Sequence, residues 1–191
     1  MKLAILSDTH RLLRPQVVDR LKHADAILHG GDINKQSIVD ELRQYAPLYI
    51  VRGNNDKEWA EAIPHELTVT LGGVRFYMVH NKKEAAPDLT DVDVVVFGHS
   101  HKYMQEKKDG VLWLNPGSCG PRRFHQEITL MMADVADGKI SVEKIGYSNF
   151  NVVGLFLSDF DAVVLSMSGR LIVFIILGLV FCFQGLQAAT D

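Results

Sequence analysis

Two side chains that can bind a metal ion follow the first apolar segment of the chain. Asp8 and His10 stand two residues apart, directly after Lys2–Leu6, a segment typical of a short buried strand. In an extended chain this spacing would place both side chains on one face. Such a pair at the end of a strand is a common start of a metal or phosphate site. Without further support, however, a capped turn with a solvated histidine explains the pair better.

Four more predicted strands end in residues of the same kind. These strands are expected over 26–28, 48–51, 74–79 and 93–97. The residues that follow them are Asp32, Asn54, His80, and the pair His99 and His101. Seven donors are too many for one tetrahedral zinc ion and suit two metal ions that share a bridging carboxylate. Carboxylate, amide and imidazole groups without thiolate favour Mn, Fe, Zn or Ni over calcium and magnesium.

The segments between the first strands predict how these residues are positioned. Amphipathic helices are expected over 15–22, which opens with Pro15, and over 36–45. Strands that alternate with helices imply right-handed crossovers and a parallel sheet. The strand ends of such a sheet gather side chains at one edge.

From residue 67 onward the pattern changes to consecutive strands. Gly72-Gly73, Asp109-Gly110 and Asp137-Gly138 stand between apolar arms and predict three hairpins. We expect these strands to form a second, more mixed sheet that packs face to face on the first, with helices outside. The predicted fold class is α/β, a four-layer α-β-β-α sandwich of two mixed sheets.

The composition indicates a globular chain without a polyelectrolyte character. Its 191 residues are 47% hydrophobic and 23% charged, enough for one sizeable core. A net charge of -3 argues against a long nucleic acid as partner. Cys119 and Cys182 lie far apart and the sequence shows no N-terminal signal peptide, so a cytoplasmic setting is expected. The oligomeric state stays open.

Apolar residues concentrate in a C-terminal tail. Residues 171–183 include no polar side chain, and charged residues become scarce near residue 150, so we expect two regions, 1–150 and 151–191. Two hypotheses explain the tail, a foreign extension of the domain and a membrane anchor over 171–189. The positive-inside rule would keep an anchored enzyme on the cytoplasmic side. A buried terminal helix of the core is a third interpretation.

The order and spacing of the candidate ligands, over residues 1 to about 145, resemble the calcineurin-like metallophosphoesterases. The matching blocks are Asp8-x-His10, Gly31-Asp32, Gly53-Asn54-x-Asp56, His80 and Gly98-His99-x-His101. The short chain, the Ser-Asp-Thr-His block at 7–10 and the Asn-Pro-Gly-Ser block at 115–118 are similar to the small prokaryotic YfcE-like phosphodiesterases.

The resemblance implies a dinuclear phosphodiesterase. One metal ion would be held by Asp8, His10, Asp32 and His101. The other would be held by Asp32, Asn54, His80 and His99. Two divalent ions, Mn first and Ni, Zn or Fe as alternatives, would support in-line attack of a bridging hydroxide on a small phosphodiester. The catalytic centre would comprise Asp8, His10, Asp32, Asn54 and Asn55.

Three residues depart from the family pattern. Asn55 stands where many relatives have a histidine, the proposed general acid, so we expect leaving groups that need little protonation. Arg11 and Asn81 stand where glycine is usual. Asparagine tolerates a left-handed backbone, whereas Arg11 does so less and is a candidate to pair with a phosphate. Arg11, Asn55 and Arg122 are the candidate substrate contacts.

Two other functions fit the same pattern. One is a non-catalytic interaction scaffold, as in the retromer subunit that resembles this family but has lost metal ligands. The other is a phosphomonoesterase. Competent residues at all seven ligand positions favour an enzyme, a metal-dependent phosphoric ester hydrolase. Asn55 argues against monoesters with poor leaving groups. Cys119 has no evident base nearby, so we do not interpret it as a nucleophile.

Overall fold

The computed structural model describes residues 1–122, 126–147, 162–167 and 170–175. The chain divides into two units, Met1–Asn149 and Phe150–Asp191. In the second unit, β11 (Ala162–Met167) and β12 (Arg170–Ile175) pair as an antiparallel hairpin. The apolar segment thus begins in a strand, and its remainder after Ile175 lies outside the described residues. Within the described ranges, no helix is both long and apolar enough to cross a membrane.

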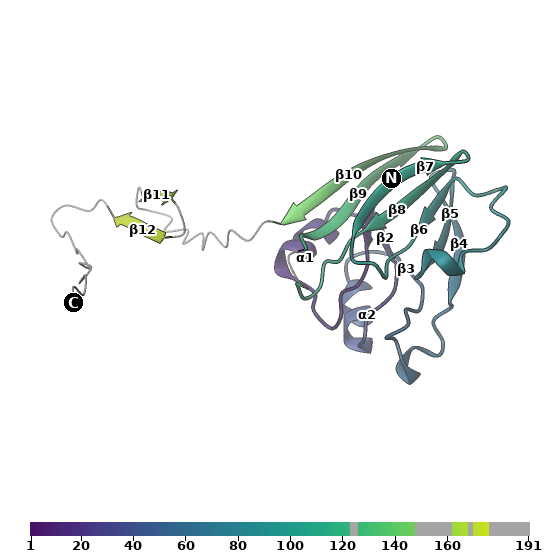
Figure 1. The fold of residues 1–191 in the computed structure, drawn as a ribbon, viewed down its shortest axis with the longest axis horizontal. Helices are drawn as coiled ribbons and strands as arrows, with labels where there is room; N and C mark the ends of the chain where they lie inside the picture. Colours follow the sequence, from purple (N-terminus) through teal and green to yellow (C-terminus); the bar gives the residue numbers. More distant parts are fainter. Residues whose placement is uncertain (123–125, 148–161, 168–169, 176–191) are drawn as a thin grey trace, which may run out of the picture. The chain divides into compact units, whose positions relative to one another are not determined.

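The first sheet of the N-terminal unit has the order β10-β9-β1-β2-β3. Figure 1 shows its strands β9 and β10 side by side in green. The parallel part of this sheet, as predicted, consists of β1 (Lys2–Leu6), β2 (Ala26–His29) and β3 (Leu48–Ile50). The hairpin of β9 (Ile128–Ala136) and β10 (Lys139–Tyr147) pairs with β1 in antiparallel fashion. The expectation that this hairpin belongs to the second sheet was therefore wrong.

Two short helices connect the parallel strands and cover the outer face of the first sheet. They are α1 (Pro15–Leu21) and α2 (Gln36–Leu42), and both end earlier than predicted. Proline fits the first turn of α1 because the amide groups there have no partner within the helix. Val17 of α1 and Leu42 of α2 are fully buried in a cluster that includes Leu6 of β1.

The second sheet has the order β4-β5-β6-β8-β7. Its parallel centre consists of β5 (Val74–Val79), β6 (Val94–Val96) and β8 (Val111–Pro116). Antiparallel edge strands β4 (Glu66–Leu71) and β7 (Tyr103–Lys108) pair with β5 and β8. The three predicted two-residue turns are all present, after β4, β7 and β9.

The two mixed sheets form the predicted sandwich. Leu3 and Ile5 of the first sheet share a buried cluster with Phe76 and Met78 of the second. On the outer face of the second sheet, the described residues form a 3-10 turn, η2 (Lys82–Glu84), and a loop instead of the expected helix. A further 3-10 turn, η1 (Glu58–Ala60), follows β3. The carboxyl ends of β1, β2, β3, β5 and β6 lead into the segments that carry the predicted ligands.

Candidate metal centre

The loops after β1 and β2 run side by side and bury two carboxylates. The amide of Asp8 donates to the Gly31 carbonyl and that of His10 donates to the Asp32 carbonyl, each at 3.0 Å. Asp8 is 0% exposed and Asp32 is 2% exposed. The expected extended backbone at Asp8 and His10 was wrong, because their φ angles are 56° and 43°. The two side chains converge because the chain coils at both residues.

Left-handed backbone is concentrated at this edge of the sandwich. Among the described non-glycine residues, nine have a positive φ, and two of them, Asp109 and Asp137, lie in hairpin turns. The other seven are Asp8, His10, Arg11, Asp32, Asn34, His99 and His101. Such conformations cost about 1–3 kcal/mol each and persist where the surrounding structure holds them, as at binding sites. Five of the seven are predicted ligands.

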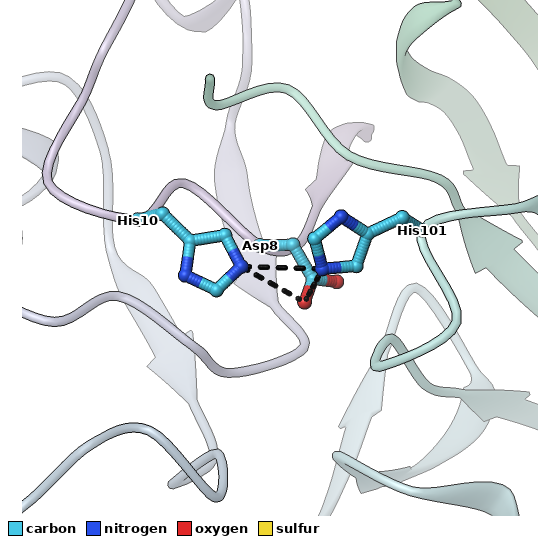
Figure 2. A group of neighbouring side chains, drawn as sticks. All are labelled: Asp8, His10 and His101. Atoms are coloured by element: carbon cyan, nitrogen blue, oxygen red, sulfur yellow. Dashed lines mark hydrogen bonds and ion pairs between the residues drawn. The ribbon is translucent and has the colours of Figure 1, made fainter. Parts of the chain in front are cut away.

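Asp8, His10 and His101 form the first group of candidate ligands. Figure 2 shows both imidazole rings directed toward the Asp8 carboxylate, with dashed lines joining one nitrogen of each ring and one carboxylate oxygen. The Nε2 atoms of His10 and His101 are 3.2 Å apart, and Asp8 Oδ1 lies 3.7 and 3.1 Å from them, respectively. The contact to His101 lacks hydrogen-bond geometry, so this buried oxygen has no hydrogen-bond partner among the described residues. A buried, unpartnered carboxylate oxygen beside two imidazole nitrogens fits a divalent cation.

Asn34 sets the tautomer of His10. Its amide nitrogen donates to the Asn55 carbonyl at 2.6 Å, so its Oδ1 faces His10 Nδ1, also at 2.6 Å. Nδ1 of His10 must therefore carry the proton, which leaves the Nε2 lone pair directed toward Asp8. Sequence reasoning missed Asn34, although it follows Asp32 with the same spacing that separates His10 from Asp8.

His80, His99 and Asn54 form the second group. His80 Nδ1 donates to the Gly30 carbonyl at 2.7 Å, and its Nε2 lies 3.1 Å from Asn54 Oδ1. His99 Nδ1 reaches the same Asn54 oxygen at 3.0 Å. His80 is buried, whereas Asn54 and His99 are exposed. The amide oxygen thus already has partners in both imidazole rings.

Asp32 lies between the two groups. Its Oδ2 is 3.5 Å from His80 Nε2 and 3.9 Å from His10 Nε2. Asn55 donates to both carboxylate oxygens, from its backbone amide at 2.8 Å and from its side chain at 2.6 Å. Burial raises the pKa of Asp32, but the hydrogen bonds and charge of His80 and the Asn55 donors hold it well below its usual range. Asp32 is therefore an anion at neutral pH.

The pKa of His80 moves in the opposite direction. Burial lowers it, but the hydrogen bond and charge of Asp32, helped by Asp8, raise the pKa above its ordinary value. The raised pKa of His80 reflects the attraction of the Asp32 and Asp8 carboxylates for positive charge at this site.

Asp56 connects the loops that carry Asp32 and Asn54. Its carboxylate is 1% exposed and accepts from the backbone amides of Ile33, Asn34 and Gly53 at 2.9, 2.6 and 2.9 Å. Three charge-assisted hydrogen bonds join the loop after β2 to the loop after β3. Asp56 belongs to the family block, but no role for it was predicted.

Two glycines of the motif blocks permit close approach beneath the site. A Cβ atom on Gly53 would collide with the Asp32 carboxylate, and one on Gly98 would collide with Ser7 Oγ and the Asp8 carboxylate. Ser7 Oγ donates to Asp8 Oδ2 at 2.7 Å and fixes that oxygen. The glycines are therefore required by space and not by conformation, since neither has a positive φ.

The buried His29 side chain connects the loop after β1 to the loop after β2. Its Nδ1 accepts from the Gly31 amide at 3.1 Å, so the proton is on Nε2, which donates to Thr9 Oγ1 at 3.1 Å. Complete burial, against the opposing charge of Asp8, lowers the pKa of His29 to about 4. His29 is therefore a neutral structural residue at pH 7.

The candidate substrate residues have different surroundings. Arg11 is exposed, has a φ of 69°, and donates from Nε to the Asn34 carbonyl at 3.3 Å. Asn81 has a φ of -108°, so the left-handed backbone considered for this position was wrong. Its side chain caps η2 by accepting from the Lys83 amide. Arg122 is half-buried at the end of a described range.

The Asn-Pro-Gly-Ser block supports the backbone of the site. Asn115 Nδ2 donates to the Gly98 carbonyl at 2.8 Å, and Ser118 Oγ donates to the Asp8 carbonyl at 3.0 Å. The neighbouring Cys119 is fully buried, and burial raises the pKa of its thiol to about 12. A neutral, enclosed thiol is not a nucleophile.

Comparison with known proteins agrees with this geometry. Residues 1–138 match the model of the calcineurin-like phosphoesterase superfamily domain. A probable metallophosphoesterase of Methanothermobacter thermautotrophicus is 31% identical over 150 residues, which cover 70% of this chain and 87% of the relative. A phosphodiesterase of Methanocaldococcus jannaschii is 28% identical over 141 residues, 62% of this chain and 84% of the relative.

A solved structure extends the likeness to the fold. Vps29 of Chaetomium thermophilum superposes with a TM-score of 0.64 at 21% identity, covering 78% of this chain and 98% of that one. Identity this low shows a shared fold alone. The family match, in contrast, spans well over half of the chain and includes every candidate ligand. The chain therefore belongs to the calcineurin-like phosphoesterase superfamily.

Proposed function

We propose that this chain is a dinuclear metal-dependent phosphodiesterase that acts on a small phosphodiester. The observation that carries the proposal is the buried Asp8 Oδ1, which has no hydrogen-bond partner among the described residues and lies beside two imidazole nitrogens. A protein that binds no metal would gain nothing from a buried carboxylate oxygen without a hydrogen bond, whereas a metal centre uses such an oxygen as a ligand. Membership of a phosphoesterase family supports the same chemistry.

The two groups of side chains suggest two metal positions. One would be held by Asp8, His10 and His101, the other by Asn54, His80 and His99. Asp32 would serve both, because its Oδ2 lies between His10 Nε2 and His80 Nε2. The donor set suits Mn, with Ni, Zn or Fe as alternatives.

The protein's own contribution is orientation and charge. Two bound divalent cations supply a nucleophile from water at neutral pH and neutralise charge on the phosphate. Asn34 and the Gly30 carbonyl accept from Nδ1 of His10 and His80, so that Nε2 is the atom of each ring that would bind a metal ion. The low pKa of Asp32 keeps its carboxylate ionised.

The chemistry of Asn55 limits which leaving groups the ester can have. Both of its donors bind Asp32, and an amide cannot protonate a leaving group near neutral pH. In our proposal Asn55 positions the shared carboxylate, and Arg11 and Arg122 are candidates to bind the phosphate. Phosphodiesters whose leaving group departs without protonation are the favoured substrates.

A chelation and reloading assay tests the proposal. Protein stripped of metal should not hydrolyse bis(p-nitrophenyl) phosphate, and added Mn should restore hydrolysis. The matched monoester, p-nitrophenyl phosphate, should react more slowly in the same preparation. Protein that binds no Mn and cleaves neither ester would falsify the proposal. Stoichiometric Mn binding without hydrolysis would favour the non-catalytic scaffold instead.

A further inference from the structure

A cavity opens beside the second group of candidate ligands. Its volume is about 370 Å³, and it is lined by the end of β6, the start of β7 and the turn η2, with His99 at its edge. Tyr103 and Met104 are half-buried and provide apolar surface, whereas Phe97 is only 2% exposed. Phe97 is held in place by an edge-on contact with Trp113, at a centroid distance of 6.2 Å. The cavity is therefore a preformed space next to the proposed position of the reacting phosphate.

The charge of this cavity is opposite to that of the whole chain. Three of its ten lining residues are Lys82, Lys83 and Lys102, and none of the ten is acidic, although the chain has a net charge of -3. Lys82 Nζ lies 5.8 Å from the centre of the Phe97 ring, within cation–π range. A second cavity, of about 300 Å³, is lined instead by Glu66, Asp88, Asp91 and one arginine, Arg75. Positive charge is thus selectively placed beside the candidate metal centre.

We propose that this cavity, named here the lysine pocket, binds one ester group of the substrate, and that this group contains both an aromatic ring and a second phosphate. The inference deepens the proposed function and rests on it, because His99 joins the pocket to the reacting phosphate. The half-buried side chains of Tyr103 and Met104 suit a flat ring, and three lysines with no acidic residue in the lining suit a dianion. A nucleoside phosphate combines both features.

The size of the pocket limits the substrate. A volume of 370 Å³ is near the lower end of the range for small-molecule sites. The pocket therefore accommodates one nucleoside phosphate and not a longer strand, in agreement with the acidic net charge of the chain.

Two substrates with the same leaving group test the lysine pocket. Thymidine 5′-(p-nitrophenyl phosphate) and its 3′-phosphorylated form both release p-nitrophenolate from the Mn-loaded full chain. The 3′-phosphate should raise kcat/KM about ten-fold, since three exposed lysines each contribute a modest attraction. Equal values of kcat/KM for the two substrates would overturn the proposal.

Variants that remove lysine charges test whether the lysine pocket causes the preference for the 3′-phosphorylated substrate. In a triple variant, Lys82→Gln, Lys83→Gln and Lys102→Gln, the preference for the 3′-phosphorylated substrate should disappear. The matched control replaces the exposed Lys107, Lys108 and Lys139 by glutamine, which changes the net charge equally at a distance from His99. The preference should survive in this control. A preference that survives in the first variant contradicts the proposal.

A binding measurement separates the lysine pocket from catalysis. Calorimetry with thymidine 3′,5′-bisphosphate and metal-free protein should show a Kd about ten-fold higher in the Lys82, Lys83, Lys102 variant than in the wild type. If no ester is cleaved but this difference is found, the phosphodiesterase proposal fails and the pocket stands. If esters are cleaved but both proteins bind the bisphosphate equally, the pocket fails and the phosphodiesterase proposal stands.

Discussion

The two groups of candidate ligands differ in how well their polar atoms are satisfied. We call Asp8, His10 and His101 the His10 half, and Asn54, His80 and His99 the His80 half. In the His10 half, a buried carboxylate oxygen has no hydrogen-bond partner among the described residues. In the His80 half, the neutral Asn54 oxygen lies within 3.1 Å of two ring nitrogens.

This difference indicates unequal dependence on metal. Without a cation, the His10 half places an unpaired carboxylate oxygen in a buried site, which destabilises the fold. The His80 half satisfies its amide oxygen internally, and Asn54 and His99 are exposed to water. We therefore expect the His10 half to bind metal more tightly and to gain more stability from it.

Asp8→Asn has the largest expected effect. Loss of an anionic ligand from the His10 half should lower kcat/KM for the chromogenic diester about 10³-fold. In the metal-free protein, however, an amide nitrogen in place of Oδ1 can donate to an imidazole nitrogen. Urea unfolding with chelator present should therefore show a variant more stable by about 1–3 kcal/mol.

An exposed aspartate provides the control for this result. Asp91→Asn makes the same chemical change far from both halves, so neither activity nor metal-free stability should move. If the metal-free Asp8→Asn variant is less stable than the wild type, Asp8 Oδ1 does not destabilise the metal-free fold, and the comparison of the two halves fails.

His99→Ala should have a smaller effect on activity, about 10²-fold, because it removes one exposed ligand from the His80 half. Mn titration should show that the weaker binding step is lost while the tighter step persists. Metal-free stability should stay near the wild-type value, since Asn54 retains the hydrogen bond to His80. Loss of the tighter step would reverse the ranking of the two halves.

Asn34→Gly should weaken only the His10 half. Glycine tolerates the φ of 66° at this position but removes the acceptor that fixes His10 Nδ1. The affinity of the tighter Mn step should fall about ten-fold, a usual size for loss of a supporting hydrogen bond. Asn34→Asp keeps the acceptor for His10 but loses the donation to the Asn55 carbonyl, so it should restore part of the affinity. If it does not, Asn34 acts through the backbone and not through the tautomer.

Deletion of 151–191 should have the smallest effect. Both halves lie in the unit Met1–Asn149, and the family match ends at residue 138. The truncated protein should retain both Mn steps and full diesterase activity. Unfolding of the truncated domain, measured by circular dichroism, would exclude a foreign extension and favour a tail that belongs to the core.

The sequence predicts the elements of the fold better than their assembly. Turn residues such as Gly72-Gly73 and apolar runs ending in aspartate or histidine locate most strands. The placement of the hairpin Ile128–Tyr147 was missed, because a largely buried strand such as β9 fits the interior of either sheet equally well. The pairing of Leu3 with Ala133 decides it, and this contact joins distant parts of the chain.

The candidate site shows the same division. Residue types and order identify seven potential ligands, and the structure brings them to one edge. The left-handed backbone at Asp8 and His10 was not predicted, because no local pattern distinguishes it from a strand end. The tautomer of His10 depends on Asn34, which is 24 residues away, and on the carbonyl of Asn55. Such details follow only from tertiary contacts.

The buried His29 sets a limit on acid tolerance. Its pKa is about 4 in the folded protein and near 6.5 when unfolded, so the unfolded chain binds the additional proton between these values. Stability should therefore be lost as pH falls from 6.5 toward 4, by roughly 3 kcal/mol in total. Metal-free His29→Gln, compared with the wild type by urea unfolding at pH 7 and pH 4.5, should lack this loss. A residue outside the candidate ligands would then limit how far the pH can fall before the folded protein loses stability.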